Sequence, residues 1–309
     1  MHKIAIVGAG RVGESTAHNL AKAELCREVT LIDIKEGVPQ GTALDIQESA
    51  PIFDFDTKLT GSNDLAAVAG AGLVIVTAGV PRKPGMSRSD VLDTNVAVLN
   101  GIVDAVLKHA PSAMLLVVTN PVDVLTYAAW RRSGFPRHRV FGMAGVLDSA
   151  RMASFIALET GFSVKDISAM VLGGHGDTMV PMTRFTTISG IPIAHFLPPD
   201  RIERIVKRTR EGGAEILSLR KTASAYDAPA AAIASMVDAI SHDRRHILPA
   251  VALLDGEYGL KDICMGVPVV FGAHGMERVI ELPLEAAEAD EFRRSAETVR
   301  ADIAKLGKK

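Results

Sequence analysis

The sequence predicts an α/β protein: an open, doubly wound parallel sheet in residues 1–144, followed by an α+β domain in residues 145–309. Short apolar runs alternate with helix-like segments through the first half, and a glycine-rich turn follows the first run. This alternation stops after about Phe141. Alternating strands and helices favour right-handed crossovers, which give a parallel sheet with helices on both faces.

The strands of the first half are predicted from four apolar runs that are short and do not alternate with polar residues, as in strands buried on both faces. These runs are Ile4–Val7, Val29–Ile32, Leu73–Thr77 and Met114–Val118. Between the first two, apolar residues recur at helical spacing from Ala17 to Leu25, which predicts an amphipathic helix.

The second half has a different pattern. Helices are predicted over 148–160, 202–217, 228–242 and 292–306, and strands broken by glycine and proline over 167–190. The pair Gly212 and Gly213 is a candidate kink in the second of these helices.

Composition excludes several classes of function. The 34 Lys and Arg residues are balanced by 36 Asp and Glu, so no nucleic-acid partner is expected. Two cysteines, Cys26 and Cys264, are too few for a disulfide framework or a four-cysteine zinc site, and no metal is expected. No run has the apolar density of a membrane span or a signal peptide, so we expect a cytoplasmic protein without a membrane partner.

A dinucleotide site is predicted by Gly8, Gly10 and Gly13, which form a G-x-G-x-x-G turn between a strand and a helix, as in a Rossmann domain. The helix N-terminus would present N–H groups to a pyrophosphate. Asp33 ends the second strand, where its carboxylate could accept hydrogen bonds from ribose hydroxyls and would repel a 2′-phosphate. The predicted cofactor is therefore NAD rather than NADP.

A catalytic group is predicted from three residues of the second half. His175 lies in the glycine-rich stretch 173–177, where small neighbours leave its ring accessible. Asp148 and Arg151 share a helix face, so they could simply form an ion pair with each other. Alternatively, the two residues have separate tasks: Asp148 favours a protonated histidine, and Arg151 binds a substrate carboxylate.

Two loops at the carboxyl edge of the sheet complete the candidate site. Segment 79–88 carries Arg82, Lys83 and Arg88, and it is either a basic surface loop or a lid that closes over an anionic substrate. Asn120 follows the next strand, where it is either a turn residue before proline or a contact to substrate or nicotinamide.

Together these motifs resemble the NAD-dependent lactate/malate dehydrogenase family, over nearly the whole chain and in the same order. Within it, the sequence is most similar to the malate dehydrogenases built on the lactate dehydrogenase plan. The segments that carry this likeness are 38–41, 79–85 and 228–232. The resemblance implies that His175 donates and accepts the proton, that Asp148 is its partner, and that Arg151 binds the C1 carboxylate.

The resemblance also implies the substrate. Arg88 would polarise the reacting carbonyl, and Asn120 would help to hold the substrate. Arg82 would contact the end of the substrate opposite its C1 carboxylate. Lactate enzymes of the family usually carry Gln at the position of Arg82, so an arginine implies a second carboxylate, as in malate and oxaloacetate. The predicted cofactor-binding residues are Gly8, Gly10, Gly13, Asp33, Asn95 and Asn120.

Three other functions remain as alternatives. An L-lactate dehydrogenase is the close alternative, and Arg82 separates it from this prediction. An NAD-dependent glycosidase of related fold would need metal-ligating Cys and His motifs, and an NAD-sensing binding protein would not need His175 and Asp148. The resemblance further implies a homotetramer or homodimer, formed through helices near 15–25, 150–160 and 230–240, and a place in the tricarboxylic acid cycle.

Overall fold

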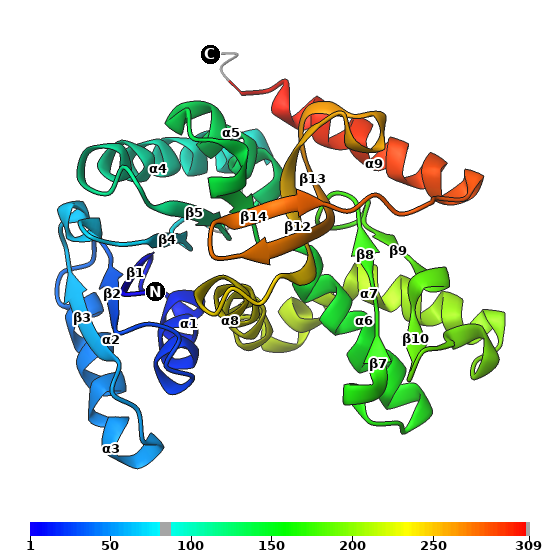
Figure 1. Cartoon of the computed structure of the whole chain (residues 1–309), viewed down its shortest axis with the longest axis horizontal. Coiled ribbons are helices and arrows are strands. Elements are labelled where there is room, and N and C mark those ends of the chain that lie inside the picture. Colours follow the sequence, from blue (N-terminus) through cyan, green and yellow to red (C-terminus); the bar gives the residue numbers. More distant parts are fainter. Residues whose placement is uncertain (81–87, 307–309) are drawn as a thin grey trace.

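A nine-stranded sheet forms the centre of the protein in the computed structural model, which describes residues 1–80 and 88–306, with only the backbone for residues 88 and 89 (Figure 1). The strand order is β14-β13-β12-β6-β5-β4-β1-β2-β3. Six strands are parallel: β1 (Lys3–Val7), β2 (Glu28–Ile32), β3 (Lys58–Ser62), β4 (Leu73–Val76), β5 (Met114–Val117) and β6 (Val140–Gly142). The four predicted apolar runs are confirmed as β1, β2, β4 and β5.

Helices cover both faces of this sheet, which explains why the run Ile4–Val7 of β1 is apolar. Ile4 and Ile6 pack in the core with residues of α1 and α8, whereas Ala5 and Val7 pack in the core with α4 and α5. In Figure 1, α4 and α5 lie above the sheet, and α1 and α8 lie below it. The helices are α1 (Arg11–Lys22), α2 (Val38–Glu48), α3 (Ala50–Phe53), α4 (Arg88–His109), α5 (Val122–Ser133), α6 (Gly145–Thr160), α7 (Pro199–Arg220), α8 (Asp227–Ser241) and α9 (Ala286–Ile303).

The second half of the chain continues the same sheet. β12 (His246–Asp255), β13 (Lys261–Gly272) and β14 (Gly275–Val279) are antiparallel, and β12 joins the parallel part where Val251 pairs with Gly142. The sequence pattern predicts no strand in this region. The long hairpin of β12 and β13 is therefore an addition to the predicted fold.

Short strands and single turns of 3₁₀ helix make up the rest. The strands are β7 (Ile167–Ser168), β8 (Val171–Leu172), β9 (Val180–Pro181), β10 (Thr187–Ile188) and β11 (Ile191–Pro192). The 3₁₀ turns are η1 (Leu65–Val68), η2 (Arg137–Arg139), η3 (Val164–Asp166), η4 (Thr183–Phe185), η5 (Ile193–His195) and η6 (Glu257–Gly259).

At Gly212 and Gly213, the candidate kink, α7 continues through both residues as one helix. These glycines instead make room for a neighbour. A Cβ atom on Gly212 would lie 3.3 Å from the Cδ atom of Arg151, which is tighter than ordinary van der Waals contact. The absence of a side chain at this position allows Arg151 to extend past α7.

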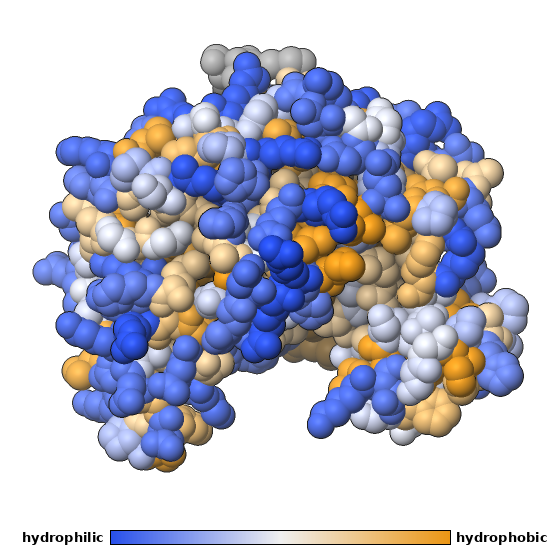
Figure 2. All heavy atoms as spheres, in the orientation of Figure 1, coloured by the Kyte–Doolittle hydropathy of each residue, from blue (hydrophilic) through white to orange (hydrophobic). Residues whose placement is uncertain are grey.

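The surface is largely hydrophilic on the face shown in Figure 2, and its lower edge is hollowed between the part that holds α3 and the part that holds β7 and β10. Within residues 1–80 and 88–306, no helix has the length and apolar character needed to cross a membrane.

Candidate active site

The glycine turn after β1 leaves open space in which a ligand could approach the protein backbone. Gly8 has a φ of +113°, and a Cβ atom on Gly13 would lie 1.8 Å from the carbonyl oxygen of Gly8, so both positions require glycine. A Cβ atom on Gly10 would meet no protein atom within 4 Å. The first N–H groups of α1 have no partner inside the helix. The turn therefore fits the pyrophosphate of a dinucleotide.

Asp33 lies directly beside this turn, at the end of β2. Its Oδ2 atom accepts a hydrogen bond of 2.8 Å from the N–H of Ala9, and its Oδ1 atom accepts one of 3.0 Å from the N–H of Lys35. The carboxylate is thus held in a fixed orientation next to Gly8 and Gly10. The structure brings together the four predicted cofactor-binding residues of this edge.

Asn95 contacts Asn120 at the carboxyl edge of the sheet, beside the ends of β4 and β5. The buried side chain of Asn95 accepts a hydrogen bond of 2.8 Å from the N–H of Val80 and donates one of 2.9 Å to the carbonyl oxygen of Asn120. Asn95 therefore ties two loops together through their backbones. Asn120 itself is exposed, and its Oδ1 atom accepts a hydrogen bond of 3.3 Å from the N–H of Val122.

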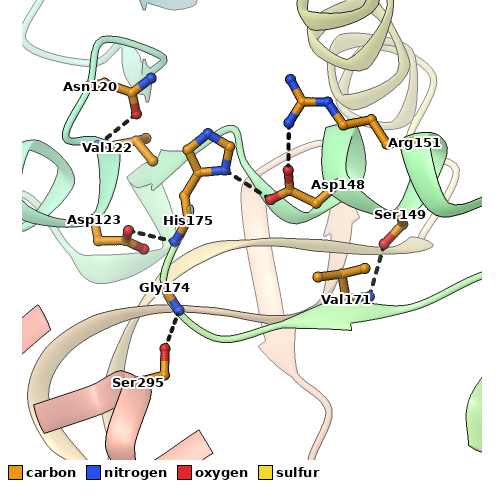
Figure 3. Close-up of polar contacts among 10 residues, drawn as sticks. All are labelled: Asn120, Val122, Asp123, Asp148, Ser149, Arg151, Val171, Gly174, His175 and Ser295. Atoms are coloured by element: carbon orange, nitrogen blue, oxygen red, sulfur yellow. Dashed lines mark hydrogen bonds and ion pairs between the residues drawn. The ribbon is translucent and has the colours of Figure 1, made fainter. Parts of the chain in front are cut away.

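Asp148 connects His175 with Arg151 (Figure 3). One of its oxygens, Oδ2, lies 2.8 Å from the Nδ1 atom of His175, and the other, Oδ1, accepts a hydrogen bond of 3.0 Å from Nη1 of Arg151. Asp148 is only 1% exposed. The local ion pair between Asp148 and Arg151 is therefore present, and the other oxygen of the same carboxylate contacts His175. In Figure 3 the second ring nitrogen of His175 points away from Asp148, and Asn120 and Arg151 lie on either side of the ring.

The environment of His175 favours its protonated form. Burial lowers the pKa of the imidazole, but the charge and hydrogen bond of Asp148 raise it, and the charge of Asp123 adds to them. The charge of Arg151 acts in the opposite direction. The result is a pKa above the ordinary histidine value, which suits a group that binds and releases a proton near neutral pH.

The turn that carries His175 is held by three successive backbone N–H groups. Gly173 donates to the carbonyl oxygen of Gly266 at 2.9 Å, Gly174 donates to Oγ of Ser295 at 2.8 Å, and His175 donates to Oδ2 of Asp123 at 2.9 Å. These partners belong to β13, α9 and α5. Figure 3 shows the last two contacts below the ring. The sequence prediction named none of the three partners.

The predicted lid lies mostly outside the described residues. Arg82 falls in the segment 81–87, and Arg88 is described only as the first residue of α4. In the described part of the chain, no group of three or more His, Cys, Asp or Glu residues could hold a metal ion.

Two family descriptions match the sequence end to end. The NAD-binding domain of lactate/malate dehydrogenase matches residues 2–142, and the α/β C-terminal domain of the same family matches residues 145–309. The fold is therefore a Rossmann-type sheet with a C-terminal α/β domain, and the cofactor of the chain is NAD.

Individual relatives agree with this assignment. The malate dehydrogenase of Thioalkalivibrio sulfidiphilus is 67% identical over 306 residues, which cover 99% of this chain and 100% of that protein. A solved malate dehydrogenase from Salinibacter ruber is 46% identical with a TM-score of 0.94, covering 98% of this chain and 97% of that one. A Cryptosporidium parvum lactate dehydrogenase, solved with lactic acid and NAD, is 39% identical with a TM-score of 0.94, covering 99% and 97%. The chain is a member of the lactate/malate dehydrogenase family of oxidoreductases.

Proposed function

We propose that this chain is an NAD-dependent malate dehydrogenase that interconverts (S)-malate and oxaloacetate. The observation that carries the proposal is the buried carboxylate of Asp148, which contacts a histidine with one oxygen and an arginine with the other. A 2-hydroxy acid needs a proton acceptor for its hydroxyl and a cation for its carboxylate. We assign cofactor binding to residues 1–144 and substrate binding and catalysis to residues 145–309.

In malate oxidation, the free ring nitrogen of His175 takes the proton of the C2 hydroxyl, and Asp148 stabilises the imidazolium that forms. In oxaloacetate reduction the same nitrogen returns the proton. Arg151 binds the C1 carboxylate through its planar guanidinium, which orients C2 toward the cofactor. Asn120 helps to hold the substrate from the other side of the ring.

A bound NAD would supply the hydride chemistry at C2. Gly8, Gly10 and Gly13 would leave room for its pyrophosphate, and Asp33 would bind its ribose hydroxyls. Asn95 supports this site by holding the loops that contain Val80 and Asn120.

The preference for malate is assigned to Arg82, with Arg88 polarising the reacting carbonyl. The relatives named malate dehydrogenase support this choice. The lactate dehydrogenase of nearly identical fold makes L-lactate the second candidate substrate. Pyruvate offers a methyl group where oxaloacetate offers a carboxylate, so it would leave Arg82 as a cation without a partner. A site built for a polar partner rejects such an analogue strongly.

The test compares kcat/KM for oxaloacetate and pyruvate in wild type and in Arg82→Gln. Wild type should prefer oxaloacetate by about 10³–10⁵-fold, and Arg82→Gln should lose most activity with oxaloacetate and gain activity with pyruvate. Arg88→Gln is the matched control, because it should lower turnover with both substrates and leave their ratio nearly unchanged. A wild type that favours pyruvate would establish the lactate alternative.

We also propose a cytoplasmic homotetramer or homodimer that serves the tricarboxylic acid cycle. Exposed apolar side chains on helices support the association, among them Leu44 on α2, Ile52 on α3 and Leu158 on α6. Light scattering of the purified protein measures the state directly, and a monomeric mass would reject it. Fractionation of the source cells tests the location.

A further inference from the structure

Asp123 is a buried carboxylate for which neither the sequence prediction nor the proposed reaction has a role. It lies in the first turn of α5 and is 5% exposed. Its Oδ2 atom accepts the backbone N–H of His175 at 2.9 Å, and its Oδ1 atom has no hydrogen-bond partner among the described residues. Burying a charge with so few partners is costly, which indicates that the carboxylate serves a purpose other than stability.

The titratable groups around Asp123 come from three neighbouring elements. His175 faces it from the turn after β8, Asp148 from α6, and the buried thiol of Cys264 from β13. Burial raises the pKa of Asp123 to about 6, and the hydrogen bond and charge of His175 act against burial. Burial also raises the pKa of Cys264, so this thiol stays neutral. When the ring of His175 is protonated, its charge therefore lies near the side chains of both Asp123 and Asp148.

We propose that Asp123 is a positioning residue for His175: its carboxylate fixes the peptide N–H of the histidine, and its negative charge stabilises the protonated ring. His175 would then depend on two acids with different tasks. Asp148 orients the ring through Nδ1, and Asp123 holds the backbone from the opposite side. The inference rests on the proposed role of His175 as the proton carrier.

A stabilised imidazolium has opposite effects on the two directions of the reaction. Oxaloacetate reduction requires protonated His175, so its kcat/KM falls as pH rises through the pKa of the ring. Malate oxidation requires the neutral ring, so its kcat/KM rises over the same range. Removing the charge of Asp123 lowers the pKa of His175 and moves both profiles toward lower pH. General loss of structure would depress both directions together and would leave the profiles in place.

The kinetic test uses Asp123→Asn and Asp123→Ala. Asparagine keeps an oxygen for the N–H of His175 and removes the charge, so both pH profiles should move by about one pH unit toward lower pH with little loss of maximal kcat. Alanine removes the oxygen as well, so the same displacement should accompany a loss of about tenfold or more in kcat. Asp262→Asn is the control, because it removes an exposed carboxylate that accepts a hydrogen bond from Tyr127.

Superimposable profiles for wild type and Asp123→Asn would overturn the electrostatic role, and equal kcat in the asparagine and alanine variants would overturn the anchoring role.

Asp123→Asn should also fold well. The pKa of this acid lies above its unfolded value, so its ionisation destabilises the native state as pH rises through about 6. The melting temperature of Asp123→Asn should therefore exceed that of wild type above this pH and approach it in acid.

An NMR titration separates this inference from the proposed reaction. The His175 ring signal is assigned in ¹³C-histidine-labelled protein by its disappearance in His175→Asn. Its midpoint should move to lower pH in Asp123→Asn and stay in place in Asp262→Asn. An unmoved midpoint overturns the inference even if His175 proves catalytic. A displaced midpoint supports it even if activity survives in His175→Asn, a result that would reject the proposed reaction alone.

Discussion

Two glycine-containing turns border the site, and they use their backbone N–H groups differently. In the turn at Gly8–Gly13, Gly8 and Ala9 donate to Ile32 and Asp33, and the turn then leads into α1, whose first N–H groups have no partner in the helix. The turn at Gly173–Gly176 donates three successive N–H groups to β13, α9 and α5. The N–H groups that open α1 suit a ligand that must bind and leave in every cycle. Occupied donors suit a side chain that must keep one position through every cycle.

One glycine from each turn shows a related difference. A Cβ atom on Gly10 would meet no protein atom within 4 Å, whereas a Cβ atom on Gly174 would lie 2.8 Å from a methyl carbon of Val299. At Gly10 the missing side chain preserves a space for the cofactor. At Gly174 it allows the backbone to pack tightly against α9.

The largest expected effect follows from removing the ring that the second turn presents. His175→Asn should lower kcat by about 10²–10⁴-fold, because the acid–base group is lost while the backbone anchors remain. The affinity for NADH, measured by fluorescence titration, should not change, because the first turn is untouched. Near-normal kcat in this variant would remove His175 from the mechanism.

The next effect distinguishes two glycines of the first turn. Gly10→Ala adds a methyl group in open space, so the fold should persist while the KM for NADH rises at least about tenfold, or about 1.4 kcal/mol. Gly13→Ala places its methyl group 1.8 Å from the oxygen of Gly8, so the backbone must move and the melting temperature should fall. Steady-state kinetics and thermal unfolding of both variants measure the difference. An unchanged KM in Gly10→Ala would argue against a pyrophosphate at this turn.

The smallest effect concerns one anchor of the second turn. Ser295→Ala leaves the N–H of Gly174 buried without an acceptor, which should cost about 1–3 kcal/mol of unfolding free energy. Two anchors remain, so kcat should fall less than in Asp123→Ala. Thr298→Ala on the same helix is the control, because its exposed hydroxyl bonds only the carbonyl of Arg294. Equal unfolding free energies for the two variants would show that Ser295 does not hold the turn.

Sequence reasoning identified both turns because glycine spacing and apolar runs are local signals. It could not identify their anchors, since Ser295 lies 121 residues after Gly174 and no local pattern joins them. Asp123 does carry a sequence signal, because it is the one charged residue in the stretch from Val122 to Ala129. In the structure every residue of that stretch is buried in α5.

The hairpin of β12 and β13 was missed for a different reason. Both strands contain proline, which normally argues against a central strand because it cannot donate a backbone hydrogen bond. In the structure Pro249 lies opposite Pro268 in the register, so the two residues without N–H groups meet at one point of the ladder. The sequence shows each proline, but only the pairing shows why both are tolerated.

The pairing of β6 with β12 has a consequence for how the chain folds during its synthesis. All six parallel strands are synthesised by Gly142, whereas β12 begins only at His246. Until β12 has been synthesised, β6 is an edge strand of the sheet. The unpaired backbone groups of an edge strand can pair with strands of other chains. β6 is only three residues long, which keeps this edge small while the rest of the chain emerges.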